Sequence, residues 1–118
     1  MISRAIPLSI HGALEMVAAP AIMAAPFLLG FGQAATTICV LVGVMLLGLA
    51  LQVEGPRRAV PVSAHAGFDY GLATLALASG VALGLATGEW LAGIFLVGVG
   101  VAQVLLAAST RFSVPRGA

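Results

Sequence analysis

The amino-acid sequence is dominated by four long apolar runs, which are separated by three short links. Only 8% of the residues are charged and 61% are hydrophobic, whereas a soluble domain has about 25% charged residues. A run of about 20 apolar residues is long enough to cross the hydrocarbon core of a bilayer as an α-helix. The sequence therefore predicts an integral membrane protein that has the lipid bilayer as its first partner.

The links place the expected membrane spans at residues 7–31, 36–53, 61–86 and 90–109, with a loop at 54–60 and a frayed tail at 110–118. Short links make neighbouring helices antiparallel, so we predict a single all-α domain, residues 1–118, folded as a four-helix transmembrane bundle. We expect the first run to be retained as a span and not removed as a signal peptide, because a later run matches it.

An internal duplication divides the chain into two units. Residues 7–15 (PLSIHGALE) return as residues 61–69 (PVSAHAGFD), and residues 41–44 (LVGV) return as residues 96–99. The first offset is 54 residues and the second is 55, which predicts that the second link has gained one residue. Because each unit contains two spans, we expect two parallel two-helix hairpin repeats, residues 7–53 and 61–109.

Arginine is the only basic residue type in the chain, and its positions predict how the spans are oriented. All five arginines fall on one side of the expected bundle: Arg4, Arg57, Arg58, Arg111 and Arg116. By the positive-inside rule this side faces the cytoplasm, so we expect a multi-pass protein of the cell membrane with both termini cytoplasmic. The arginines form no long basic run, so no nucleic-acid partner is expected.

The arrangement of these segments resembles a known family. A helix opens with histidine and an acid, residues 25–31 (APFLLGF) follow, and a glycine-bearing helix comes next, with the whole pattern given twice. This resembles the SPW-repeat family of small membrane proteins, with residues 25–27 (APF) and 79–81 (SGV) in the place of the defining tripeptide. The resemblance covers nearly the whole chain. It implies two-helix repeats in a membrane and implies no activity.

The ionisable side chains within the spans are the candidate functional residues. His11 precedes Glu15 by four positions, and His65 precedes Asp69 by the same spacing, so each pair shares one face of its helix. Both pairs lie at one depth near the cytoplasmic face, and small residues on the same stripes favour a position inside the bundle. Gln103 on the last span reaches this depth and is the expected hydrogen-bond partner of the carboxyl groups.

Three functional hypotheses remain open for this group. The favoured one is a structural or assembly role, in which the pairs join helices within the protein, in a homo-oligomer or with another membrane protein. The second is transport of protons or a divalent cation, with His11, Glu15, His65 and Asp69 as a metal or proton site. The third is a membrane subunit that binds haem through His11 and His65.

Enzymatic activity is not expected from this sequence. It contains no Gly-x-Ser-x-Gly, no phosphate-binding loop and no His-Glu-x-x-His motif. The single cysteine, Cys39, lies within an apolar run, which excludes an intrachain disulfide and a cysteine metal cluster.

Overall fold

The computed structural model describes residues 5–54 and 62–112, which form four long helices and two very short strands. In chain order these elements are β1 (Ile6–Pro7), α1 (Leu8–Leu29), α2 (Gln33–Glu54), α3 (Val62–Thr87), α4 (Trp90–Ala108) and β2 (Thr110–Arg111). Each of the four helices is long and apolar enough to cross a membrane. The prediction of an all-α, four-span membrane protein is therefore confirmed.

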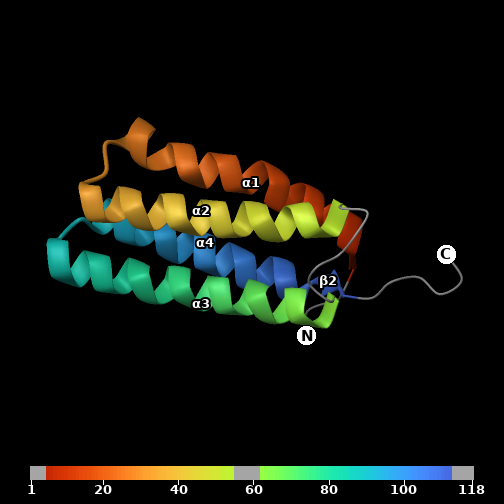
Figure 1. Ribbon diagram of the computed structural model, residues 1–118. Helices are drawn as coiled ribbons and strands as arrows, with labels where there is room; N and C mark the ends of the chain where they lie inside the picture. The colour runs from red at the N-terminus through yellow and green to blue at the C-terminus, as the bar shows by residue number, and fades with distance from the viewer. Residues whose placement is uncertain (1–4, 55–61, 113–118) are drawn as a thin grey trace, which may run out of the picture.

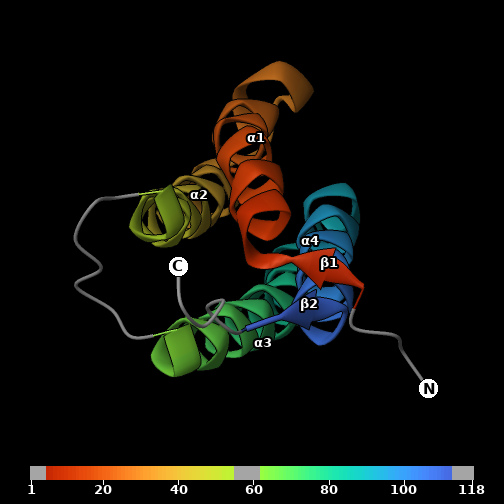
Figure 2. The same ribbon diagram turned by 90° about the vertical axis from the view of Figure 1, so that its right-hand side faces the viewer.

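The helices pair as two antiparallel hairpins that point the same way. Helix α1 packs along α2, and α3 packs along α4, while α2 also contacts α3 (Figure 1). Helices α1 and α3 both begin at the end of the bundle where β2 lies (Figure 1). Viewed from that end, α1 and α3 stand diagonally across the bundle (Figure 2). Residues near the starts of these two helices can therefore face each other across the bundle interior.

The expected spans agree with the observed helices to within three residues at every boundary. Helix α1 ends one turn after Pro26, where Gly30 adopts a left-handed conformation (φ 68°) and its N–H donates to the Pro26 carbonyl oxygen. A residue without a Cβ adopts this conformation without strain. Helix α2 begins at Gln33, earlier than expected, and includes Glu54, which was assigned to the loop. The loop residues 55–60 and four of the arginines lie outside the described residues: Arg4, Arg57, Arg58 and Arg116.

The two short strands tie the ends of the chain together. Ile6 pairs with Thr110 and Pro7 with Arg111 in a parallel arrangement, and the Ile6 N–H donates to the Ser109 carbonyl oxygen at 2.9 Å. The prediction that the tail frays from Thr110 onward is therefore wrong for Thr110 and Arg111, because backbone pairing holds them against the start of α1. This pairing places both residues at the end of the bundle that carries the histidines.

Glycine positions show how closely the helices of each hairpin approach. A Cβ on Gly43 would press on the Ala19 carbonyl oxygen of α1, and a Cβ on Gly100 would press on the Ala73 carbonyl oxygen of α3. Ala73 follows Ala19 by 54 residues, but Gly100 follows Gly43 by 57. By packing, Gly43 corresponds to Gly100 and not to Gly98, so the expected offset of 55 in the second helices is wrong. The common origin of the two hairpins remains a prediction.

The bundle interior separates into an apolar part and a polar end. The apolar core is formed by small and branched side chains from all four helices, including Ala19, Ile22, Cys39, Val42, Leu46, Leu72, Leu83 and Leu96. Among the described residues, the buried polar side chains are His11, Glu15, His65, Asp69, Gln103 and Thr110. These six all lie toward the end where α1 and α3 begin, so the candidate site occupies one end of an otherwise apolar bundle.

Candidate functional site

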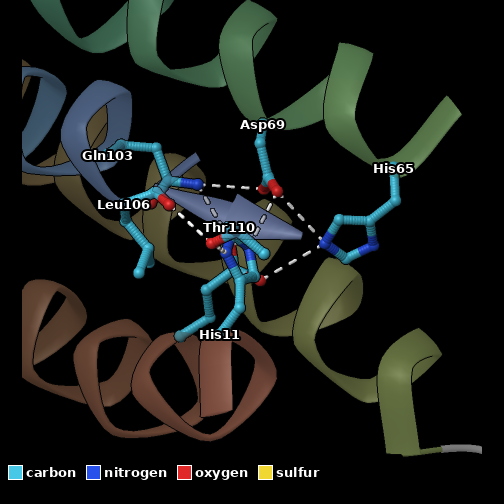
Figure 3. Close-up of polar contacts among 7 residues, drawn as sticks. His11, His65, Asp69, Gln103, Leu106 and Thr110 are labelled. Carbon is cyan, nitrogen blue, oxygen red and sulfur yellow. Dashed lines mark hydrogen bonds and ion pairs between the residues drawn. The ribbon is translucent and has the colours of Figure 1, made fainter. Parts of the chain in front are cut away.

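Four ionisable side chains from two diagonal helices meet inside the bundle (Figure 3). His11 and Glu15 come from the first turns of α1, and His65 and Asp69 come from the first turns of α3. His11, Glu15 and Asp69 are fully buried, and His65 is 3% exposed. The structure thus brings together all four residues that the sequence singled out. We call this group the His/acid centre.

Each histidine contacts the acid of its own helix and the acid of the other hairpin. The His11 Nε2 atom lies 3.1 Å from Glu15 Oε2 and 2.9 Å from Asp69 Oδ2. The His65 Nε2 atom lies 3.2 Å from Asp69 Oδ2 and 3.4 Å from Glu15 Oε1. The His/acid centre therefore joins the two hairpins to each other as well as successive turns of each helix.

Gln103 adds a third connection between the hairpins. Its side-chain amide nitrogen donates to Glu15 Oε2 at 2.8 Å and to Asp69 Oδ1 at 2.9 Å. An amide NH₂ has two hydrogens, and both are used here, one for each carboxylate. The prediction that Gln103 bonds the carboxyl groups is confirmed, and the contacts show that it serves both at once.

Thr110 is a partner of the centre that the sequence did not reveal. Its Oγ1 atom lies 2.7 Å from His11 Nδ1 and donates to the Leu106 carbonyl oxygen at 2.5 Å (Figure 3). Because the hydroxyl hydrogen is used for Leu106, the oxygen acts as the acceptor of the His11 Nδ1–H. Thr110 follows the expected end of the last span, and no local signal marked it as buried. Only the pairing of β1 with β2 places it against His11.

The bond to Thr110 assigns the hydrogens on the His11 ring. With Nδ1 protonated, a neutral imidazole has a bare lone pair on Nε2, and this atom faces the carboxylates. Two electron-rich atoms do not hold one another at 2.9 Å without a positive charge between them. Hence Nε2 of His11 either carries a second proton or binds a cation.

Two atoms of the centre lack a hydrogen-bond partner within the described part of the chain. They are Glu15 Oε1 and His65 Nε2, both fully shielded from solvent. Although these atoms face each other at 3.4 Å, the geometry does not make a hydrogen bond. A buried polar atom without a partner is costly and uncommon in proteins. These two atoms therefore mark a specific place where the centre has unused binding capacity.

Aromatic and apolar groups shield the centre. The Phe112 ring lies 5.2 Å from the His11 ring and 6.1 Å from the His65 ring, measured between ring centroids. On the other side of Gln103, the interior continues as apolar core with a cavity of about 10 Å³. Such a cavity holds at most about one water molecule. The centre is thus closed on its inner side by apolar packing.

No family model, curated protein or solved structure matches this chain. Membership in the SPW-repeat family accordingly remains a prediction from the sequence. The geometry of the His/acid centre is therefore the principal basis for a functional proposal.

Proposed function

We propose that this chain is a small multi-pass membrane protein with a structural or assembly role, in which the His/acid centre joins two hairpins within the bilayer. One observation carries the proposal: each histidine contacts both carboxylates, and all four side chains are buried. A contact set that crosses between the hairpins twice holds them in one register.

The energetics of the bilayer favour such pairing. An isolated charged side chain at the centre of a membrane helix costs roughly 2.5–3.5 kcal/mol on insertion scales. When both histidines are protonated, their two positive charges balance the two carboxylates of Glu15 and Asp69. The group is then neutral as a whole, and Gln103 supplies donors to the carboxylate oxygens. Breaking the hairpins apart would expose unbalanced charges to lipid, which opposes their separation.

Transport across the membrane has less support than a structural role. A proton or ion relay needs successive polar groups or water through the bundle. Among the described residues, the buried polar side chains are confined to one end, and the apolar core extends beyond Gln103. The His/acid centre has no polar continuation there through which a proton could pass.

Haem binding by His11 and His65 has less support as well. Bis-histidine haem ligation requires the iron and its macrocycle to lie between the two imidazole rings. Here the ring centroids are only 5.6 Å apart, and both Nε2 atoms are directed at carboxylate oxygens. The space between the rings is thus occupied by acid groups that a haem would have to displace.

The proposal includes placement in the cell membrane with both termini cytoplasmic, and it includes no enzymatic activity. It also includes self-association, since Gly67 and Gly71 on α3 leave open space where another membrane helix can approach closely. Crosslinking in membranes, with Gly67→Leu and Gly71→Leu as variants, tests this part. Loss of a crosslinked dimer in both variants is expected, whereas an unchanged or undetected dimer would contradict self-association.

A double-mutant cycle between His11 and Asp69 tests the structural role. The free energy of unfolding is measured in lipid–detergent micelles, with chelator present, for His11→Ala, Asp69→Asn and the double variant. We expect a coupling energy above about 1 kcal/mol, since the two residues are in direct contact. Glu89→Gln combined with Asp69→Asn is the control and is expected to be additive, because Glu89 bonds Gly32 at the opposite end. Additivity in both cycles would overturn the proposal.

A further inference from the structure

We propose that the His/acid centre is a binding site for a divalent transition-metal ion, with Zn²⁺ as the best-suited ion. The ligands would be Nε2 of His11, Nε2 of His65, one oxygen of Glu15 and Oδ2 of Asp69. This inference rests on the proposed joining of the hairpins, since it requires the same four side chains to meet.

The distances between the four groups are those of a tetrahedral site. Zinc binds imidazole nitrogen and carboxylate oxygen at about 2.0–2.2 Å, so neighbouring ligand atoms of a tetrahedron lie about 3.3–3.5 Å apart. The four nitrogen–oxygen distances in the centre run from 2.9 to 3.4 Å, and all ligand atoms lie within 4.8 Å of one another. Small side-chain shifts would bring the four atoms to the distances that zinc requires.

The two unpartnered atoms are a second and independent observation. Glu15 Oε1 and His65 Nε2 are buried, face each other and have no hydrogen-bond partner. Both are electron-pair donors when the carboxylate is ionised and the ring nitrogen is unprotonated. A cation between them would satisfy both atoms at once, which a network of hydrogen bonds within the centre does not do.

The surrounding contacts are those that orient metal ligands. Metal-binding histidines commonly donate their other ring N–H to an acceptor, which fixes the tautomer and the ring orientation. Thr110 accepts from His11 Nδ1 and in this way directs the Nε2 lone pair toward the carboxylates. Gln103 bonds Asp69 through Oδ1, which leaves Oδ2 for the ion. The same amide holds Glu15 through Oε2 and leaves Oε1 unused.

Charge balance allows the exchange inside an apolar bundle. Two protonated histidines and two carboxylates sum to zero, and one divalent ion with two neutral histidines and two carboxylates also sums to zero. A divalent ion can thus replace two protons without leaving net charge in the membrane. Two imidazole ligands favour zinc and its neighbours over Ca²⁺ and Mg²⁺, which prefer oxygen ligands.

Titration of the purified, chelator-treated protein with Co²⁺ tests this inference, because four-coordinate Co²⁺ has intense visible absorption bands. We expect one Co²⁺ per chain, displaced by Zn²⁺ and not by Ca²⁺. Asp69→Asn and His65→Ala each remove a ligand and are expected to weaken binding by more than about 100-fold. Thr110→Val keeps all four ligands and is expected to weaken binding by roughly 10–100-fold. Cys39→Ser and Glu89→Gln are the controls and should bind as the parent protein does.

Absence of a visible band at saturating Co²⁺ would overturn the metal site, as would a band that persists in both Asp69→Asn and His65→Ala. The helical circular dichroism of each variant separates lost binding from lost folding, and Thr110→Val tests the site with every ligand present. The two proposals fail distinguishably. Coupling between His11 and Asp69 in chelator without Co²⁺ binding would remove only the metal site, whereas loss of both would remove the joined hairpins as well.

Discussion

His11 and Thr110 are joined by a 2.7 Å hydrogen bond although 99 positions separate them in the chain. The bond connects the start of α1 to the strand after α4 and orients the His11 ring toward the carboxylates of Glu15 and Asp69. A residue beyond the last membrane span thereby determines which nitrogen of a buried histidine faces the centre.

Removing the acceptor for His11 should destabilise the protein without removing any member of the His/acid centre. In Thr110→Val the Nδ1–H of His11 remains buried without its partner, and the expected loss is about 1–3 kcal/mol in the free energy of unfolding. Thr37→Val is the matched control, because Thr37 is exposed and bonds only the Gln33 carbonyl within its own helix. Equal stability of the two variants would show that the Thr110 contact contributes nothing.

Gln103→Leu tests whether one amide serves both carboxylates. The substitution keeps a side chain of similar length but removes both donors, so two buried carboxylate oxygens lose a hydrogen bond. We expect the free energy of unfolding to fall by roughly 2–4 kcal/mol, since each bond to a charged group contributes about 1.5–3 kcal/mol and part of this is recovered by burial of the leucine. Gln33→Leu on the exposed start of α2 is the control. A loss no larger than that of the control would refute the shared-donor role.

Close helix packing within the second hairpin predicts a contrast between two glycines. A Cβ on Gly80 would lie 2.7 Å from the Gly93 carbonyl oxygen of α4, which is backbone and cannot rotate away. Gly80→Ala should therefore force α3 and α4 apart and cost about 1–3 kcal/mol. Gly98→Ala places its methyl group in open space and should leave stability nearly unchanged. Thermal unfolding of both variants in the same detergent measures the difference, and equal midpoints would contradict the packing described here.

The proposed orientation predicts which end of the bundle is accessible from outside the cell. In a Cys39→Ser background, a cysteine introduced at Gly88, in the link between α3 and α4, should react with a membrane-impermeant maleimide in intact cells. A cysteine introduced at Gly55 should react only after the cells are opened, because the adjoining Arg57 and Arg58 place it in the cytoplasm. The reverse labelling pattern would invert the proposed topology.

The sequence alone determined the general architecture and the membership of the His/acid centre. Four apolar runs and their short links predicted the spans, and spacing of four positions placed each histidine beside an acid on one helical face. These properties depend only on helical periodicity and on the cost of exposing polar groups to lipid. They can be read from the chain without knowing how its helices pack. Gln103 was also within reach of this reasoning, because its depth follows from the rise per residue of a helix.

The tertiary structure decided which atoms meet. Contacts of His11 with Asp69 and of His65 with Glu15 require a particular register between diagonal helices, and that register depends on close approaches at Gly43 and Gly100. The three extra residues between these glycines, relative to the first helices, were misjudged from a short repeated motif. Thr110 became part of the centre only through backbone pairing between the two ends of the chain. Such pairing depends on the whole fold, and no local pattern encodes it.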